Sequence, residues 1–390
     1  MKIIFKFIQV VVLGATSACS ISGPGDDGQE ATRKAIVRSA ADRVLAPAYA
    51  EASTALSGLA DAARSYADAV AGGEADPQAK RDAARVAFGT AMDAWQRVEM
   101  LLVGPAGPAG LVTGGESLRD EIYSFPVTNR CRIDEELAEG SFEEPNFFTA
   151  NLVNVRGLDA VEYLLFVEGT DNACDATRPI NKDGTWQALG ADEIVRRRAE
   201  YAARAAEDAA ARAAALASRW SPGTGDAYAA FVSAGEAGSP YPTTRVALDE
   251  FSSGLFDLDT HVKDRKLAAH APEELESPLS ARSKENVLAN LAAAWEIFYA
   301  APSAGEGTGY DDWLANVGQA SLVADVDAAF AAAEAAVRAV PGSFETALAD
   351  DPNALLGAQS AVGDLAALLK GPFLAALDLM PPADGAGDAD

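Results

Sequence analysis

Histidine is scarce in this sequence, since only His261 and His270 occur among its 390 residues. A zinc hydrolase needs neutral imidazole ligands and an open coordination position, and these two histidines do not form an HExxH-like pair. We therefore expect both to be surface residues, which leaves a zinc peptidase poorly supported. No GxSxG sequence occurs either, so the residues give no positive signal for an enzyme.

Basic residues are also few. The chain has 31 Lys and Arg against 58 Asp and Glu, and its formal net charge is −27. Such a charge argues against nucleic acid or an anionic membrane surface as a partner, because both repel an acidic protein. It suits solubility and the attraction of cations. A solvated acidic surface accounts for most of these charges.

Alternating strand patterns are almost absent after residue 20, whereas alanine is abundant and recurs in long periodic runs. Alanine is the best helix former, so we expect an all-α protein that is either one large domain or two packed halves. The expected helices cover residues 31–72, 78–103, 146–168, 191–220, 242–259, 280–300, 309–339, 343–350 and 353–377. The Gly/Pro-rich stretch after residue 103 is expected to be a connection or a lid.

The N-terminus carries export signals. Residues 1–18 combine two lysines with an apolar run that is too short to span a membrane, which is typical of a secretory signal peptide. The sequence that ends in Cys19 resembles a bacterial lipobox, so we expect Cys19 to be lipidated and to anchor the protein facing the periplasm. Residues 19–30 are expected to form a flexible tether and residues 380–390 a disordered tail.

Cysteine is rare, with three in the chain. Apart from Cys19, only Cys131 and Cys174 remain, and no CxxC or Cys/His spacing indicates a metal site. Export places this even pair in an oxidising compartment, where a disulfide is expected. Both cysteines lie in loops that flank the expected central helix.

That helix contains the best site candidates, Asp159 and Glu162. They stand three residues apart in an otherwise apolar run, so they share one helical face in a buried position. Glu99, one turn beyond a tryptophan in an earlier helix, is expected to project toward the same interior. An all-oxygen set suits hard cations such as ferric iron, calcium, magnesium or manganese better than zinc. Alternatively, Arg97 or Arg156 neutralises these acids in a buried polar network.

A family resemblance begins at the same place. The sequence GLDAVEYLLF resembles the central motif of the imelysin family of cell-envelope proteins, Gly-x-His-x-x-Glu. Gly157 and Glu162 match this motif, whereas Asp159 stands where the motif has its histidine.

Other segments support the resemblance in the expected order, from about residue 35 to 375: AWQRVEMLLVGP, RDEIYSFP, KDRKLA and SKENVLANLAAAWEIFYA. The resemblance implies two antiparallel helical bundles packed side by side, which we place at residues 31–190 and 191–379. It also implies a periplasmic location and a link to iron, and the family name implies a peptidase.

Together these observations predict an exported, lipid-anchored protein that binds iron or another hard cation during metal uptake or handling in the cell envelope. One alternative is a metal-dependent peptidase, although the replacement of the motif histidine by Asp159 argues against zinc. Another is a non-catalytic adaptor lipoprotein that binds a protein partner in the envelope.

Overall fold

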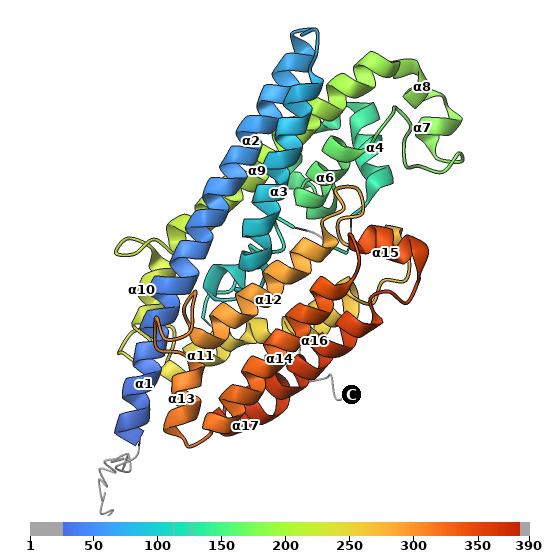
Figure 1. Cartoon of the computed structure of the whole chain (residues 1–390). Helices are drawn as coiled ribbons and strands as arrows, with labels where there is room; N and C mark the ends of the chain where they lie inside the picture. Colours follow the sequence, from blue (N-terminus) through green and yellow to red (C-terminus); the bar gives the residue numbers. More distant parts are fainter. Residues whose placement is uncertain (1–25, 112, 124, 127, 383–390) are drawn as a thin grey trace, which may run out of the picture.

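The computed structural model describes residues 26–111, 113–123, 125–126 and 128–382, and these residues form helices and loops without a β-strand. The expected all-α fold is confirmed. The helices pack as two groups that lie side by side (Figure 1). The expected signal peptide at 1–18 and the expected lipidation site Cys19 lie outside the described residues.

The first bundle is built on three long helices: α2 (Ala46–Ala71), α3 (Gln78–Glu99) and α9 (Ala191–Arg219). Gly73 has a positive φ of 65° in the turn between α2 and α3, a conformation that glycine adopts at no steric cost. The buried face of α9 is largely alanine, which lets its backbone lie close along α2. Two shorter helices, α4 (Arg130–Glu139) and α6 (Leu158–Phe166), pack on this group.

The second bundle is formed by α12 (Ser283–Tyr299), α14 (Ala320–Ala339) and α16 (Leu356–Leu368), together with the π-helix η6 (Leu258–Lys266). α11 (Thr244–Ser252) and α13 (Tyr310–Asn316) close one end, where the Thr243 hydroxyl caps α11 by accepting from Val246 N at 3.2 Å. The segment from Leu356 to Leu377 is long and apolar enough to cross a membrane by composition, but it packs against α14 and η6. The remaining short α-helices of the described residues are α5 (Phe147–Ala150), α7 (Pro179–Lys182), α8 (Thr185–Leu189), α10 (Asp226–Val232), α15 (Phe344–Asp350) and α17 (Leu374–Leu377).

The two groups do not divide at residues 190/191, where the sequence placed the boundary. α9 packs along α2 and α6 and so lies in the first bundle. The first helical segment crosses between the groups, because α1 (Asp26–Ser39) packs on α11 and α13, whereas α2 continues into the first bundle through the π-turn η1 (Ala40–Leu45) (Figure 1). Alanine-rich periodicity identifies helices but does not reveal which neighbour each one packs against.

Both expected flexible segments are partly ordered. α1 already begins at Asp26, inside the expected tether. At the other end, Met380 N donates to Asp249 Oδ1 at 2.8 Å, which fixes the start of the expected tail on α11.

The central helix is shorter than expected. Instead of one helix over 146–168, the chain forms α5, a 3₁₀ turn (Val153–Val155) and then α6. Gly157, whose backbone is extended, lies between the 3₁₀ turn and α6. The next residue, Leu158, donates its backbone N–H to Ile122 O at 2.9 Å. A Cβ at Gly157 would lie 2.8 Å from that carbonyl and 2.7 Å from Val153 Cγ2, so the motif glycine permits the 122–123 segment to approach α6.

Candidate cation site at the bundle interface

Glu99 lies at the last residue of α3, only 2% exposed, where the two bundles meet. Its Oε2 accepts from Lys266 Nζ at 2.6 Å and from Asn290 Nδ2 at 3.1 Å. Its Oε1 lies 2.9 Å from His261 Nε2. Burial alone would raise the pKa of Glu99, but the charge and hydrogen bonds of Lys266 and His261 hold it well below the usual range. Glu99 is therefore an ionised carboxylate with both oxygens engaged.

Lys266 is the centre of this cluster and is only 1% exposed. Besides Glu99, its ammonium lies 2.9 Å from Glu276 Oε1, 2.6 Å from Gln96 Oε1 and 2.8 Å from Asn290 Oδ1. Burial would lower its pKa, but Glu276 and Glu99 raise it above the ordinary value, so it stays charged. The sequence does not point to this residue, because a lysine is almost never fully buried unless it is paired, and its partners are distant in sequence.

His261 was expected on the surface, and this prediction is wrong, since the side chain is 8% exposed and bonded to Glu99. It lies on η6, and π-helical turns occur often at functional sites. The expectation holds for His270, which is exposed and contacts Pro352 O through Nδ1 at 3.1 Å. The two histidines thus have different partners.

Asp159 and Glu162 lie in α6, are 4% exposed each, and share one face of the helix. Glu162 Oε1 accepts from Ser280 N at 2.9 Å and Ser280 Oγ at 2.7 Å, so its hydrogen-bond donors are neutral. Burial raises the pKa of Glu162 to about 7, with Asp159 adding to the rise and Ser280 and Arg130 opposing it. This carboxyl therefore keeps its proton to a higher pH than an exposed glutamate does.

Both arginines considered as neutralising partners pair with acids outside the candidate set. Arg97 contacts Glu51 at 2.6 Å and Glu296 at 2.8 Å, and Arg156 contacts Glu121 and Asp208, the latter at 3.4 Å. The neutralising cation of Glu99 is a lysine from the second bundle, distant in sequence from both arginines.

Tyr123 connects the two groups of acids. Its hydroxyl donates to Glu276 Oε1 at 2.6 Å, next to Lys266. Burial raises the pKa of Tyr123 well above its usual value, and the charges of Glu276, Asp159 and Glu99 add to this rise. The phenol therefore stays protonated and donates to Glu276, beside the lysine cluster.

A cavity of about 270 Å³ opens beside these residues, lined in part by Glu99, Tyr123 and His261. The three candidate acids do not meet at one point. In the described part of the chain, one set of at least three Cys, His, Asp or Glu residues has its ligand atoms within 4.8 Å of one another, namely Cys131, Glu135 and Cys174. Two of these ligands are disulfide sulfurs.

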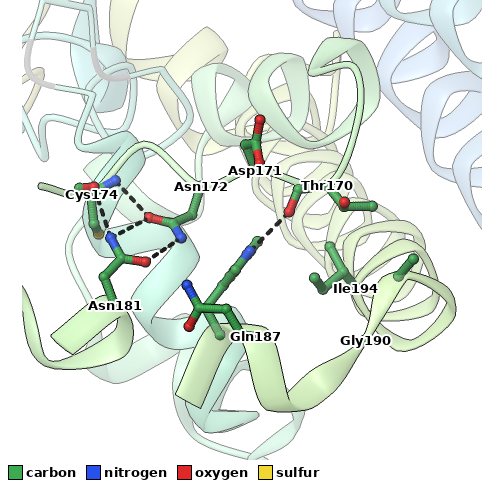
Figure 2. A pocket seen from close by; sticks show the side chains of 10 residues that line it. Thr170, Asp171, Asn172, Cys174, Asn181, Gln187, Gly190 and Ile194 are labelled. Carbon is green, nitrogen blue, oxygen red and sulfur yellow. Dashed lines mark hydrogen bonds between the residues drawn. The ribbon is translucent and has the colours of Figure 1, made fainter. Parts of the chain in front are cut away.

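The expected disulfide between Cys131 and Cys174 is present, and it ties the loop after α6 to α4. A cavity of about 620 Å³ lies beside this loop (Figure 2). Asn172 and Asn181 on its wall donate to each other at 2.7 and 3.1 Å, and Asn172 Oδ1 also accepts from Cys174 N at 2.9 Å. These amides are engaged with one another, so they hold the loop together rather than offer ligand contacts.

The fold and site define an all-α, two-bundle protein with buried acids at the interface of its bundles. The imelysin family model matches residues 45–370 of the chain, which therefore belongs to the imelysin family. The resemblance seen in the motif segments is confirmed.

Individual relatives agree with this assignment. The chain is 25% identical over 329 residues to iron-regulated protein A of Synechococcus elongatus, covering 82% of this chain and 80% of that protein. Its fold is similar to that of an iron-regulated protein A precursor from Parabacteroides distasonis, with a TM-score of 0.66, 18% identity, and coverage of 89% and 95% of the two chains. An imelysin-like protein from Psychrobacter arcticum gives a TM-score of 0.65 at 15% identity, with coverage of 90% and 98%.

Proposed function

We propose that this protein binds a hard metal cation, with iron the favoured ion, at Asp159 and Glu162, and that it serves metal uptake or handling in the bacterial envelope. The observation that carries the proposal is the pair of buried carboxyls on α6; among the described residues, the hydrogen-bond donors of Glu162 are the neutral groups of Ser280. A buried acid pair is stabilised by a proton or by a cation, and carboxylate oxygens are ligands that hard cations prefer.

For Glu99 we propose a role other than that of the metal ligand expected from the sequence. Because both of its oxygens are engaged by Lys266, Asn290 and His261, Glu99 acts as the counter-charge that keeps Lys266 buried beside the site. The cation ligands are then Asp159 and Glu162, with solvent or a co-ligand completing the coordination sphere.

Iron is favoured because two of the relatives are named as iron-regulated proteins. The secretory pattern at residues 1–18 and the lipobox ending at Cys19 support export and lipid anchoring, and an intact disulfide suits an oxidising compartment. The acidic net charge of −27 adds a general attraction for cations.

The test is calorimetric titration of the chelator-treated protein with ferric citrate, calcium, manganese and zinc. We expect saturable one-site binding that is lost in Asp159→Asn/Glu162→Gln and kept in the control variant Glu74→Gln/Glu144→Gln, which removes two exposed acids. Equal binding in all three proteins, or none in any, would refute the proposal. The latter result would favour an adaptor that binds a protein partner. A peptidase instead requires peptide hydrolysis that depends on Glu162.

A further inference from the structure

A second and larger cavity, of about 770 Å³, adjoins the one beside Glu99. The two cavities share three lining residues, Arg119, His261 and Arg265. The larger cavity lies between the loop that follows α3, the helices α11 and η6, and the chain segment 380–382. Its volume is in the range that accommodates a small organic molecule.

Hydrogen bonds between the segments that form this cavity hold its walls in place. Gly104 N donates to Glu250 Oε1 at 2.6 Å, which ties the loop after α3 to α11. Met380 N donates to Asp249 Oδ1 at 2.8 Å, which ties the C-terminal segment to the same helix. The cavity is therefore formed before any ligand arrives, and binding needs little ordering of the chain.

Most of the wall is apolar. The apolar side chains come from the loop after α3, from α11, from the turn before η6 and from the C-terminal segment: Leu102, Leu111, Val246, Phe256, Met380 and Pro381. Met380 is 64% exposed, an unusual degree for a large apolar side chain in this protein. A ligand that covers these side chains gains binding free energy because it removes their apolar surface from water.

The acidic side chains of the wall are already engaged. Asp249 and Glu250 accept the backbone bonds that close the cavity, and burial raises the pKa of both carboxyls. Asp257 accepts from Arg119 Nη1 at 2.9 Å. These acids therefore do not make the cavity a site for a cationic ligand.

Arg265 is different, because this exposed arginine forms no ion pair or hydrogen bond with any residue that the structure describes. By contrast, Arg119 is compensated by Asp257 and by Asp120, at 2.9 and 3.0 Å. A planar guanidinium matches a carboxylate with two parallel hydrogen bonds. Arg265 thus offers an anion site where the two cavities meet.

His261 adds a second polar group at this junction. Glu99 is ionised and can only accept, so His261 Nε2 carries the proton of their 2.9 Å hydrogen bond. Nδ1 then remains on the opposite side of the ring, and it forms no hydrogen bond within the described part of the chain. Nδ1 can therefore accept a hydrogen bond from a ligand hydroxyl.

We infer that this cavity binds a small organic carboxylate, with its carboxylate on Arg265 beside His261 and its apolar body against Val246, Phe256 and Met380. The inference is independent of cation binding at α6. Asp159 and Glu162 do not line this cavity.

The test compares 2-naphthoate with 2-naphthamide, which have the same apolar body and differ in charge. Binding is followed by calorimetry in chelator-treated protein. We expect naphthoate to bind about tenfold more tightly than naphthamide, because a hydrogen-bonded charge pair contributes roughly that factor. Arg265→Gln should remove this preference and leave naphthamide binding unchanged, which shows that the cavity is intact.

Two further variants make the result specific. Met380→Ser should weaken both compounds alike, because it removes apolar contact without changing charge. Arg43→Gln, at an exposed arginine of η1 away from the cavity, should change neither. The inference is overturned if naphthoate does not bind, if both compounds bind equally to the unaltered protein, or if the preference for naphthoate survives in Arg265→Gln.

Discussion

Replacing Glu162 by glutamine should make the protein more stable at alkaline pH and change it little at acid pH. Burial raises the pKa of this carboxyl from 4.5 to about 7 in the folded protein. Between these two values the folded state binds more protons than the unfolded state, so stability falls as pH rises through this window. This loss of unfolding free energy is nearly absent below about pH 4.5. Above pH 7 it approaches about 3 kcal/mol for a pKa shift of this size.

The glutamine keeps the carbonyl oxygen that accepts from Ser280 but cannot ionise. Its advantage over glutamate should therefore grow by about 2.5 kcal/mol between pH 5 and pH 8. The assay is urea unfolding of both proteins, followed by circular dichroism in chelator-containing buffer across this range. Burial raises the pKa of Asp134 to about 6. This carboxyl affects the stability of both proteins equally, so its effect cancels in the difference. A difference that stays constant with pH would refute the assignment of Glu162 as a buried carboxyl with a raised pKa.

Three further variants test the parts that hold the site together. Lys266→Met should cost about 3–5 kcal/mol of unfolding free energy, because it leaves buried charge unpaired. Adding Glu99→Gln should recover part of this loss. No recovery in urea unfolding would argue against the ion pair between Lys266 and Glu99. Gly157→Ala should cost about 1–3 kcal/mol, since its Cβ would press on Ile122 O, and an unchanged melting curve would contradict this contact. The double change Cys131→Ser/Cys174→Ser should cost about 2–4 kcal/mol, a loss that reducing agent should reproduce in the unaltered protein but not in the variant.

The sequence predicted the helical elements well where their periodicity is long. α9 matches its expected range within one residue, because it is a long periodic run with clear ends. The central helix was predicted too long, since the break at Gly157 follows from a tertiary hydrogen bond to Ile122 rather than from a local signal. Helix propensity carries no information about such a contact.

The candidate site was predicted in part. Asp159 and Glu162 stand out because acids in an apolar helix are rare, and both are buried as expected. Their surroundings could not be predicted, because Ser280, Lys266 and His261 come from the second bundle and carry no signal of burial in the sequence. A lysine or histidine in a charged stretch such as HVKDRK reads as solvent-exposed until its tertiary partners are known.

The most direct test of cation binding is anomalous diffraction from crystals of the protein soaked in manganese or ferric citrate. If α6 holds the cation, one strong peak should lie within about 2.0–2.6 Å of a carboxylate oxygen of Glu162 or Asp159. That peak should be lost in Asp159→Asn/Glu162→Gln. A peak only at other acids would contradict cation binding at α6. So would the lack of a peak at α6 if the protein binds the ion in solution.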